Sequence, residues 1–75
     1  MAHYRFDDES GRKWSAWEVR LSDTANVHPG LRAGWIVFES DDEKRRLAPI
    51  PAEWEKATEA MVRRWCREAV IVPKH

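Results

Sequence analysis

The sequence is poor in cysteine, with Cys66 as its only thiol, and it has no long apolar run. A single cysteine cannot close a disulfide within the chain or complete a zinc site built on several cysteines, so we expect a reducing compartment. No apolar run is longer than four residues, the length of residues 35–38, far fewer than the roughly 20 of a membrane-spanning helix. The first eight residues lack the basic start and apolar stretch of a secretory signal. These absences predict a cytoplasmic protein with no membrane segment.

The sequence also lacks an excess of charge of either sign. Thirteen Lys and Arg balance thirteen Asp and Glu, so the formal net charge is zero, and composition predicts no overall attraction to nucleic acid or to an anionic membrane. The charge is nevertheless divided, because residues 1–43 carry five basic and nine acidic side chains, a net of −4, and residues 44–75 carry eight and four, a net of +4. This division suits either a self-complementary dimer surface or attraction within one molecule.

Aromatic residues are plentiful by contrast, with five Trp, two Phe and one Tyr in 75 residues. A chain of this length has room for one hydrophobic core, so residues 1–75 are expected to form a single domain. Each aromatic ring can remove roughly 150 to 250 Å² from water. The rings are therefore expected to supply most of the core.

Two strands are predicted before residue 22. Residues 4–7 alternate aromatic and polar side chains, and Gly11 supplies a turn residue that tolerates positive φ. Residues 13–21 form the second strand, whose expected core face carries Trp17, Val19 and Leu21. Trp14 falls outside this phase, so either a bulge near Ser15 turns it inward or it is exposed as a contact residue.

Residues 22–33 contain turn-forming side chains and few periodic apolar residues, so we interpret them as a long surface loop. Residues 34–39 are aromatic and β-branched and apolar on both faces, which is typical of a central strand. Residues 44–47 predict a short strand whose charges suit an exposed edge. Pro49 and Pro51 end that strand because proline donates no backbone hydrogen bond.

A helix is predicted from Pro51 to Ala69, because proline suits the first helical position and basic residues gather near the predicted carboxyl end. Its apolar stripe spans an arc of about 140°. The stripe consists of Trp54, Ala57, Thr58, Met61, Val62, Trp65 and Ala69. A basic ridge of Lys56, Arg63 and Arg67 lies opposite the stripe. Residues 70–75 are interpreted as an extended tail that covers a sheet edge.

This order of elements predicts an α+β fold, an antiparallel four-stranded meander followed by one C-terminal helix packed on one face. Strong twist would roll the meander into a small half-open barrel, and the sequence leaves the choice between open sheet and barrel undecided. Since one helix covers one face, we expect indole groups to remain exposed on the other.

The chain contains WSAWEV at residues 14–19, GWIVFES at residues 34–40 and RRLAPIPAEW at residues 45–54. These three segments resemble a group of small bacterial proteins for which no activity is established. The resemblance implies a bacterial, cytoplasmic, single-domain protein, and it carries over no catalytic residue.

The first functional hypothesis is a non-enzymatic interaction module that binds a partner protein, or a second copy of itself, through an aromatic sheet face. Tryptophan is enriched among the residues that dominate protein interfaces. Trp14, outside the strand phase, and Trp35, on a strand apolar on both faces, are therefore the main candidates. The predicted partner-binding residues are Trp14, Trp35, Val37, Arg45 and Arg46.

The alternative hypothesis is a small nucleic-acid-binding regulator. Basic side chains of the last strand and the helix would contact phosphates, and an exposed indole would stack on a base. The candidate residues are Lys44, Arg45, Arg46, Lys56, Arg63 and Arg67. Four glutamates in the predicted helix region and the zero net charge weigh against this hypothesis.

The sequence predicts no arrangement of catalytic residues. Cys66 lies at the edge of the apolar stripe, and the histidines His3, His28 and His75 lie at the termini or in the loop, so the thiol has no evident base. The acidic runs at residues 7–9 and 41–43 lack the spacing of a calcium loop. We therefore expect no catalytic residue, metal, cofactor or small-molecule substrate.

Overall fold

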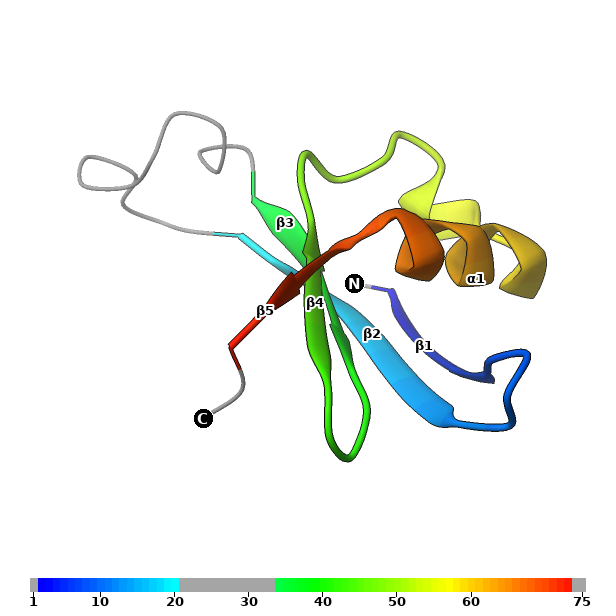
Figure 1. The fold of residues 1–75 in the computed structure, drawn as a ribbon. Helices are drawn as coiled ribbons and strands as arrows, with labels where there is room; N and C mark the ends of the chain where they lie inside the picture. Colours follow the sequence, from blue (N-terminus) through cyan, green and yellow to red (C-terminus); the bar gives the residue numbers. More distant parts are fainter. Residues whose placement is uncertain (1, 21–33, 74–75) are drawn as a thin grey trace.

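Five strands form one antiparallel sheet in the computed structural model, which describes residues 2–20 and 34–73 (Figure 1). The strands are β1 (His3–Asp7), β2 (Lys13–Val19), β3 (Trp35–Glu39), β4 (Lys44–Leu47) and β5 (Val70–Val72). They lie in the order β1-β2-β3-β4-β5, so each strand pairs with its neighbours in sequence. A short 3₁₀ helix, η2 (Trp54–Lys56), and the helix α1 (Glu59–Glu68) separate β4 from β5.

The sheet confirms the predicted α+β class and adds a strand to the predicted meander. Residues 44–47 were expected at an exposed edge, but β4 lies inside the sheet because β5 pairs with it, Arg46 opposite Val70 and Lys44 opposite Val72. The sheet is open, since β1 and β5 are its two edges and do not pair with each other. Leu21 and the predicted loop at residues 22–33 lie outside the described residues.

The predicted helix begins too early. Residues 51–58 hold a turn and η2 instead of regular helix, and α1 starts at Glu59 after Thr58, whose Oγ1 accepts from the Met61 N–H at 3.2 Å. The reason is a contact from the far end of the chain. The Tyr4 hydroxyl donates to the Trp54 carbonyl at 2.6 Å and accepts from the Ala57 N–H at 3.2 Å, so these backbone groups bond to β1.

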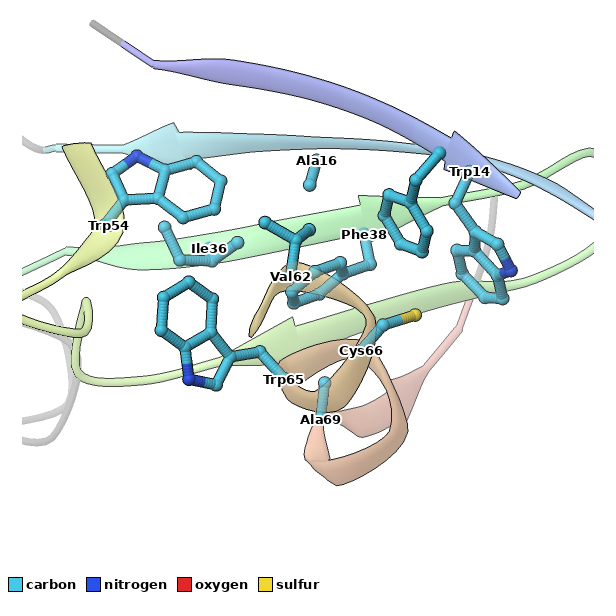
Figure 2. Packing of buried hydrophobic residues seen from close by; sticks show 10 residues of the cluster. Trp14, Ala16, Ile36, Phe38, Trp54, Val62, Trp65, Cys66 and Ala69 are labelled. Atoms are coloured by element: carbon cyan, nitrogen blue, oxygen red, sulfur yellow. The ribbon is translucent and has the colours of Figure 1, made fainter. Parts of the chain in front are cut away.

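Helix α1 packs against one face of the sheet and contacts both β1 and β4 (Figure 1). We call this face the covered face. Figure 2 shows its core, with Trp54 and Trp65 near one end, Phe38 and Val62 in the middle and Trp14 near the other end. The buried cluster consists of Phe6, Trp14, Ala16, Ile36, Phe38, Trp54, Val62, Trp65, Cys66 and Ala69. No helix among the described residues is long and apolar enough to cross a membrane.

The predicted phase of β2 is inverted. Trp14 and Ala16 point to the covered face, so Trp17 and Val19, predicted as core, lie on the other side. No bulge interrupts the pairing with β1, in which Trp14 stands opposite Phe6 and Ala16 opposite Tyr4. Ala16 is fully buried in the cluster, and its small side chain leaves space there for the neighbouring rings.

Candidate functional site

One face of the sheet bears no described helix, and we call it the open face. Strand register shows which residues lie on it. Side chains alternate along each strand, so residues opposite Trp17 share its face. Trp17 pairs with His3 and Val37, and Val37 pairs with Arg46, which pairs with Val70. The open face therefore carries His3, Arg5, Asp7, Lys13, Ser15, Trp17, Val19, Trp35, Val37, Glu39, Lys44, Arg46, Val70 and Val72.

The centre of the open face is apolar and aromatic. Trp17 stands opposite Val37 and Val19 opposite Trp35 on the paired strands β2 and β3. Val37 is only 5% exposed although no described helix covers it, because its cross-strand neighbours Trp17 and Arg46 flank it. Trp17 and Trp35 are themselves half-buried. The His3 and Trp17 rings form an edge-to-face contact with their centroids 6.3 Å apart.

A shallow groove of about 390 Å³ runs across this centre. Trp17 and Trp35 line it on β2 and β3, and Arg46 lines it on β4. Val72 and Pro73 line it beside the sheet edge. The groove therefore connects the aromatic centre with the edge strand β5.

The basic side chains of β4 on the open face, Lys44 and Arg46, form no ion pair with a described residue. Glu39 stands opposite Lys44 in the register without such a pair. The groove thus combines apolar surface with two cations that form no ion pair with a described residue.

Two predicted partner-binding residues, Trp14 and Arg45, lie on the covered face, although Arg45 also lines the groove. Trp14 is 2% exposed, and its Nε1 donates to Asp8 Oδ2 at 2.8 Å. The Arg45 guanidinium lies 4.8 Å from the Trp14 ring centroid, donates to the Cys66 carbonyl at 2.7 Å and pairs with Glu43. These bonds occupy both side chains within the fold. Trp35, Val37 and Arg46 do lie together on the open face.

The titration of the groups around Trp14 follows from the same contacts. Hydrogen bonds from the Ser10 hydroxyl, the Trp14 indole and nearby backbone N–H groups hold the pKa of Asp8 well below its usual range. A hydrogen bond from Arg45 likewise lowers the pKa of Glu43. Burial raises the pKa of the Cys66 thiol to about 11, although Arg45 opposes the change. The thiol is therefore protonated at neutral pH, which disfavours a nucleophilic role.

The residues predicted to bind nucleic acid do not form one surface. Lys44 and Arg46 face the groove, whereas Arg63 and Arg67 lie on α1 at the other side of the sheet. Arg63 donates to the Asp7 carbonyl at 2.8 Å and pairs with Glu59 at 2.8 Å. Arg67 pairs with Glu9 at 3.0 Å. Lys56 lies in η2. Two members of the basic ridge, Arg63 and Arg67, are thus engaged with acidic and backbone groups of the same chain.

Sequence reasoning missed Trp17 and Val19 as residues of this face, together with the flanking His3 and Arg5. Alternation along β3 could have identified them. Trp35 and Val37 were already candidates, and their cross-strand partners must lie on the same face. Among the described residues, no group of three or more His, Cys, Asp or Glu side chains lies close enough to hold a metal ion.

Comparison of the chain with protein-family models, curated proteins and solved structures gives no match. The resemblance of its motifs to small bacterial proteins thus stays an expectation, and its function is inferred from the geometry of its own residues.

Proposed function

We propose that this chain is a non-enzymatic binding module of the bacterial cytoplasm that holds a partner protein on the open face of its sheet. The carrying observation is the groove in which Trp17 and Trp35 remain partly accessible beside Val37. Tryptophan is among the residue types that most often dominate the binding energy of protein interfaces, and here two partly exposed indoles lie on one surface. No described helix packs on them, so a partner would gain their remaining apolar area.

The partner's chemistry follows from the charges beside the groove. Lys44 and Arg46 lack a carboxylate partner among the described residues, so a segment that combines apolar side chains with Asp or Glu complements the groove. The apolar contacts would supply most of the affinity, and the charges would orient the segment and raise its rate of encounter.

A library of displayed random peptides, selected on the immobilised protein, tests this function. We expect enriched peptides with an aromatic or aliphatic residue next to Asp or Glu. Their dissociation constants, measured by fluorescence polarisation, should rise at least tenfold for Trp35→Thr, since threonine keeps strand propensity while removing the indole. Arg64→Ala is the matched control, because Arg64 is exposed on α1 and should not affect binding.

Two outcomes would overturn the proposal. Enriched peptides that bind Trp35→Thr as tightly as the native protein would place the binding elsewhere. A labelled oligothymidine that binds more tightly than any peptide, with an affinity that falls steeply as salt rises, would favour the nucleic-acid alternative, using Lys44 and Arg46 with the groove indoles in place of the dispersed set predicted above.

A further inference from the structure

The two edges of the sheet differ in how well they are protected against strand addition. An edge strand presents unpaired backbone N–H and C=O groups, and charged side chains normally discourage another chain from pairing there. Edge β1 carries the charged Arg5 and Asp7, and the Asp7 carbonyl already accepts a hydrogen bond from Arg63. Edge β5 carries no charge. Its Val70 and Ile71 are 63% and 67% exposed, and they are the large hydrophobic residues left exposed in the described part of the chain.

The structure also fixes the surroundings of β5. The strand follows directly after α1, whose last turn is closed by the Ala69 N–H bonded to the Trp65 carbonyl at 2.9 Å. Val70 lies beside Arg46 and Val72 beside Lys44 on the open face, whereas Ile71 lies beside Arg45 and points to the covered side. Pro73 follows β5 and cannot donate to a strand ladder. The edge strand is therefore short, it is already formed in the sheet, and the side of the sheet to which each of its side chains points is defined.

We propose that the partner segment adds to the sheet as a sixth strand along β5, with an acidic–apolar–acidic pattern of side chains. This inference rests on the proposed function, because it takes the same partner and the same two cations. A residue opposite Ile71 would point to the covered side and pack on that exposed side chain. The residues opposite Val70 and Val72 would point to the open face.

Charge complementarity decides the occupant. The added strand lies two strand spacings, about 10 Å, from β4, a span that an arginine or lysine and a glutamate side chain bridge together across the small valines. Arg46 and Lys44 would then meet one carboxylate each. A second copy of this chain, paired through its own β5, would place only valine and isoleucine there, and both cations would stay unpaired. An acidic segment therefore fits this edge better than a second copy does.

A pair of peptides of equal composition tests the inference. The first is acetyl-threonine-glutamate-isoleucine-glutamate-threonine-amide. The control exchanges each glutamate with the neighbouring threonine, which moves the carboxylates to the other face of the strand. In titrations followed by backbone amide chemical shifts of the full chain, we expect the first peptide to shift β5 and β4 resonances and to bind at least fivefold more tightly than the control.

Backbone and side-chain changes then separate strand addition from other binding modes. N-methylation of the peptide at the alternate residues whose N–H groups point toward β5 should abolish binding, because it removes the donors of the hydrogen-bond ladder. Arg46→Gln should weaken the first peptide at least threefold and leave the control peptide unchanged, and Ile71→Thr should weaken both peptides. Arg64→Ala should weaken neither.

Several results would overturn the inference. Among them are equal binding of the two peptides, binding unaffected by N-methylation, and no binding at millimolar concentration. A dimer that forms with rising concentration, dissociates in Ile71→Thr and excludes the peptide would make a second copy the occupant. If library peptides depend on Trp35 yet tolerate N-methylation and Ile71→Thr, the edge inference fails while the proposed function stands. If no library peptide depends on Trp35, the proposed function itself fails.

Discussion

Trp14 and Trp17 lie three residues apart on the same strand, and they serve opposite faces of the sheet. Trp14 is enclosed at one end of the core, its N–H bonded to Asp8 and its ring beneath Arg45. Trp17 lies half-buried on the open face, where His3 and Val37 are its neighbours. The difference teaches that residue type does not assign a role here. The side on which α1 packs assigns it, and the other side is left with partly exposed aromatic surface.

The same contrast recurs on β4, where neighbouring arginines face opposite ways. Arg45 is tied to Glu43, to the Cys66 carbonyl and to the Trp14 ring. Arg46 faces the groove and has no ion pair among the described residues. The two faces therefore offer two matched pairs of residues, one aromatic and one cationic, for testing the assignment.

The largest expected effect comes from the aromatic pair. Trp14→Ala should lower the free energy of unfolding by about 3 to 5 kcal/mol, because it opens a cavity in the core. A chain of this length commonly has only about 4 to 11 kcal/mol in total. Trp17→Ala should cost less than about 2 kcal/mol, since its indole is already partly hydrated. Urea unfolding followed by circular dichroism measures both variants. Equal losses would mean that both indoles are core and that the open face is not a binding surface.

The cationic pair should give a smaller difference in the same direction. Arg45→Ala removes a charged hydrogen bond to a carbonyl and the contact with Trp14, so we expect a loss of about 1 to 3 kcal/mol. Arg46→Ala should change the free energy of unfolding by less than about 0.5 kcal/mol, while it weakens any ligand selected on the groove. Destabilisation by Arg46→Ala as large as that by Arg45→Ala would contradict the assignment of Arg46 to binding.

The sequence was sufficient for the α+β class, for the central position of β3 and for the placement of Trp35 and Val37 on one face of that strand. Alternation shows which residues of a strand share a face, but it does not show which face a helix will cover. On β2 the count of large apolar residues favoured Trp17, Val19 and Leu21. Residues outside β2 enclose Trp14 instead: Phe6 stands opposite it on β1, Asp8 accepts from its indole N–H, and the Arg45 guanidinium lies over its ring.

The start of the helix was missed for a similar reason. Pro51 and Thr58 both carry start signals, the first as an initial helical residue and the second as a cap. The hydroxyl of Tyr4, 50 residues from Trp54 in the chain, decides between them by bonding to the Trp54 carbonyl. Local propensity contains no information about such a contact. Likewise, β4 is an inner strand because β5 pairs with it. The charges of residues 44–46 had indicated an exposed edge instead.

The smallest expected effect is confined to acid and concerns the carboxylate that holds Trp14. Asp8 accepts hydrogen bonds from the Ser10 hydroxyl, the Trp14 indole and the backbone N–H groups of Ser10 and Arg12, which lower its pKa in the folded state. A carboxyl whose folded pKa lies below its unfolded value of about 3.9 stabilises the fold fully above that pH. The stabilisation is lost as the pH falls from there toward the folded pKa.

Asp8→Asn should therefore flatten the acid limb of stability without removing it, because Glu43 and Glu18 also have lowered pKa values and contribute in the same direction. Urea unfolding midpoints measured between pH 7 and pH 2 test this. The difference between Asp8→Asn and the native chain should be greatest at neutral pH and should shrink below pH 4. Glu53→Gln is the control, because Glu53 is exposed and its side chain makes no cap hydrogen bond to η2. A difference in unfolding midpoint between Asp8→Asn and the native chain that stays constant down to pH 2 would contradict this prediction. It would mean that the charge of Asp8 does not help to hold Trp14 in the core and that packing alone does so.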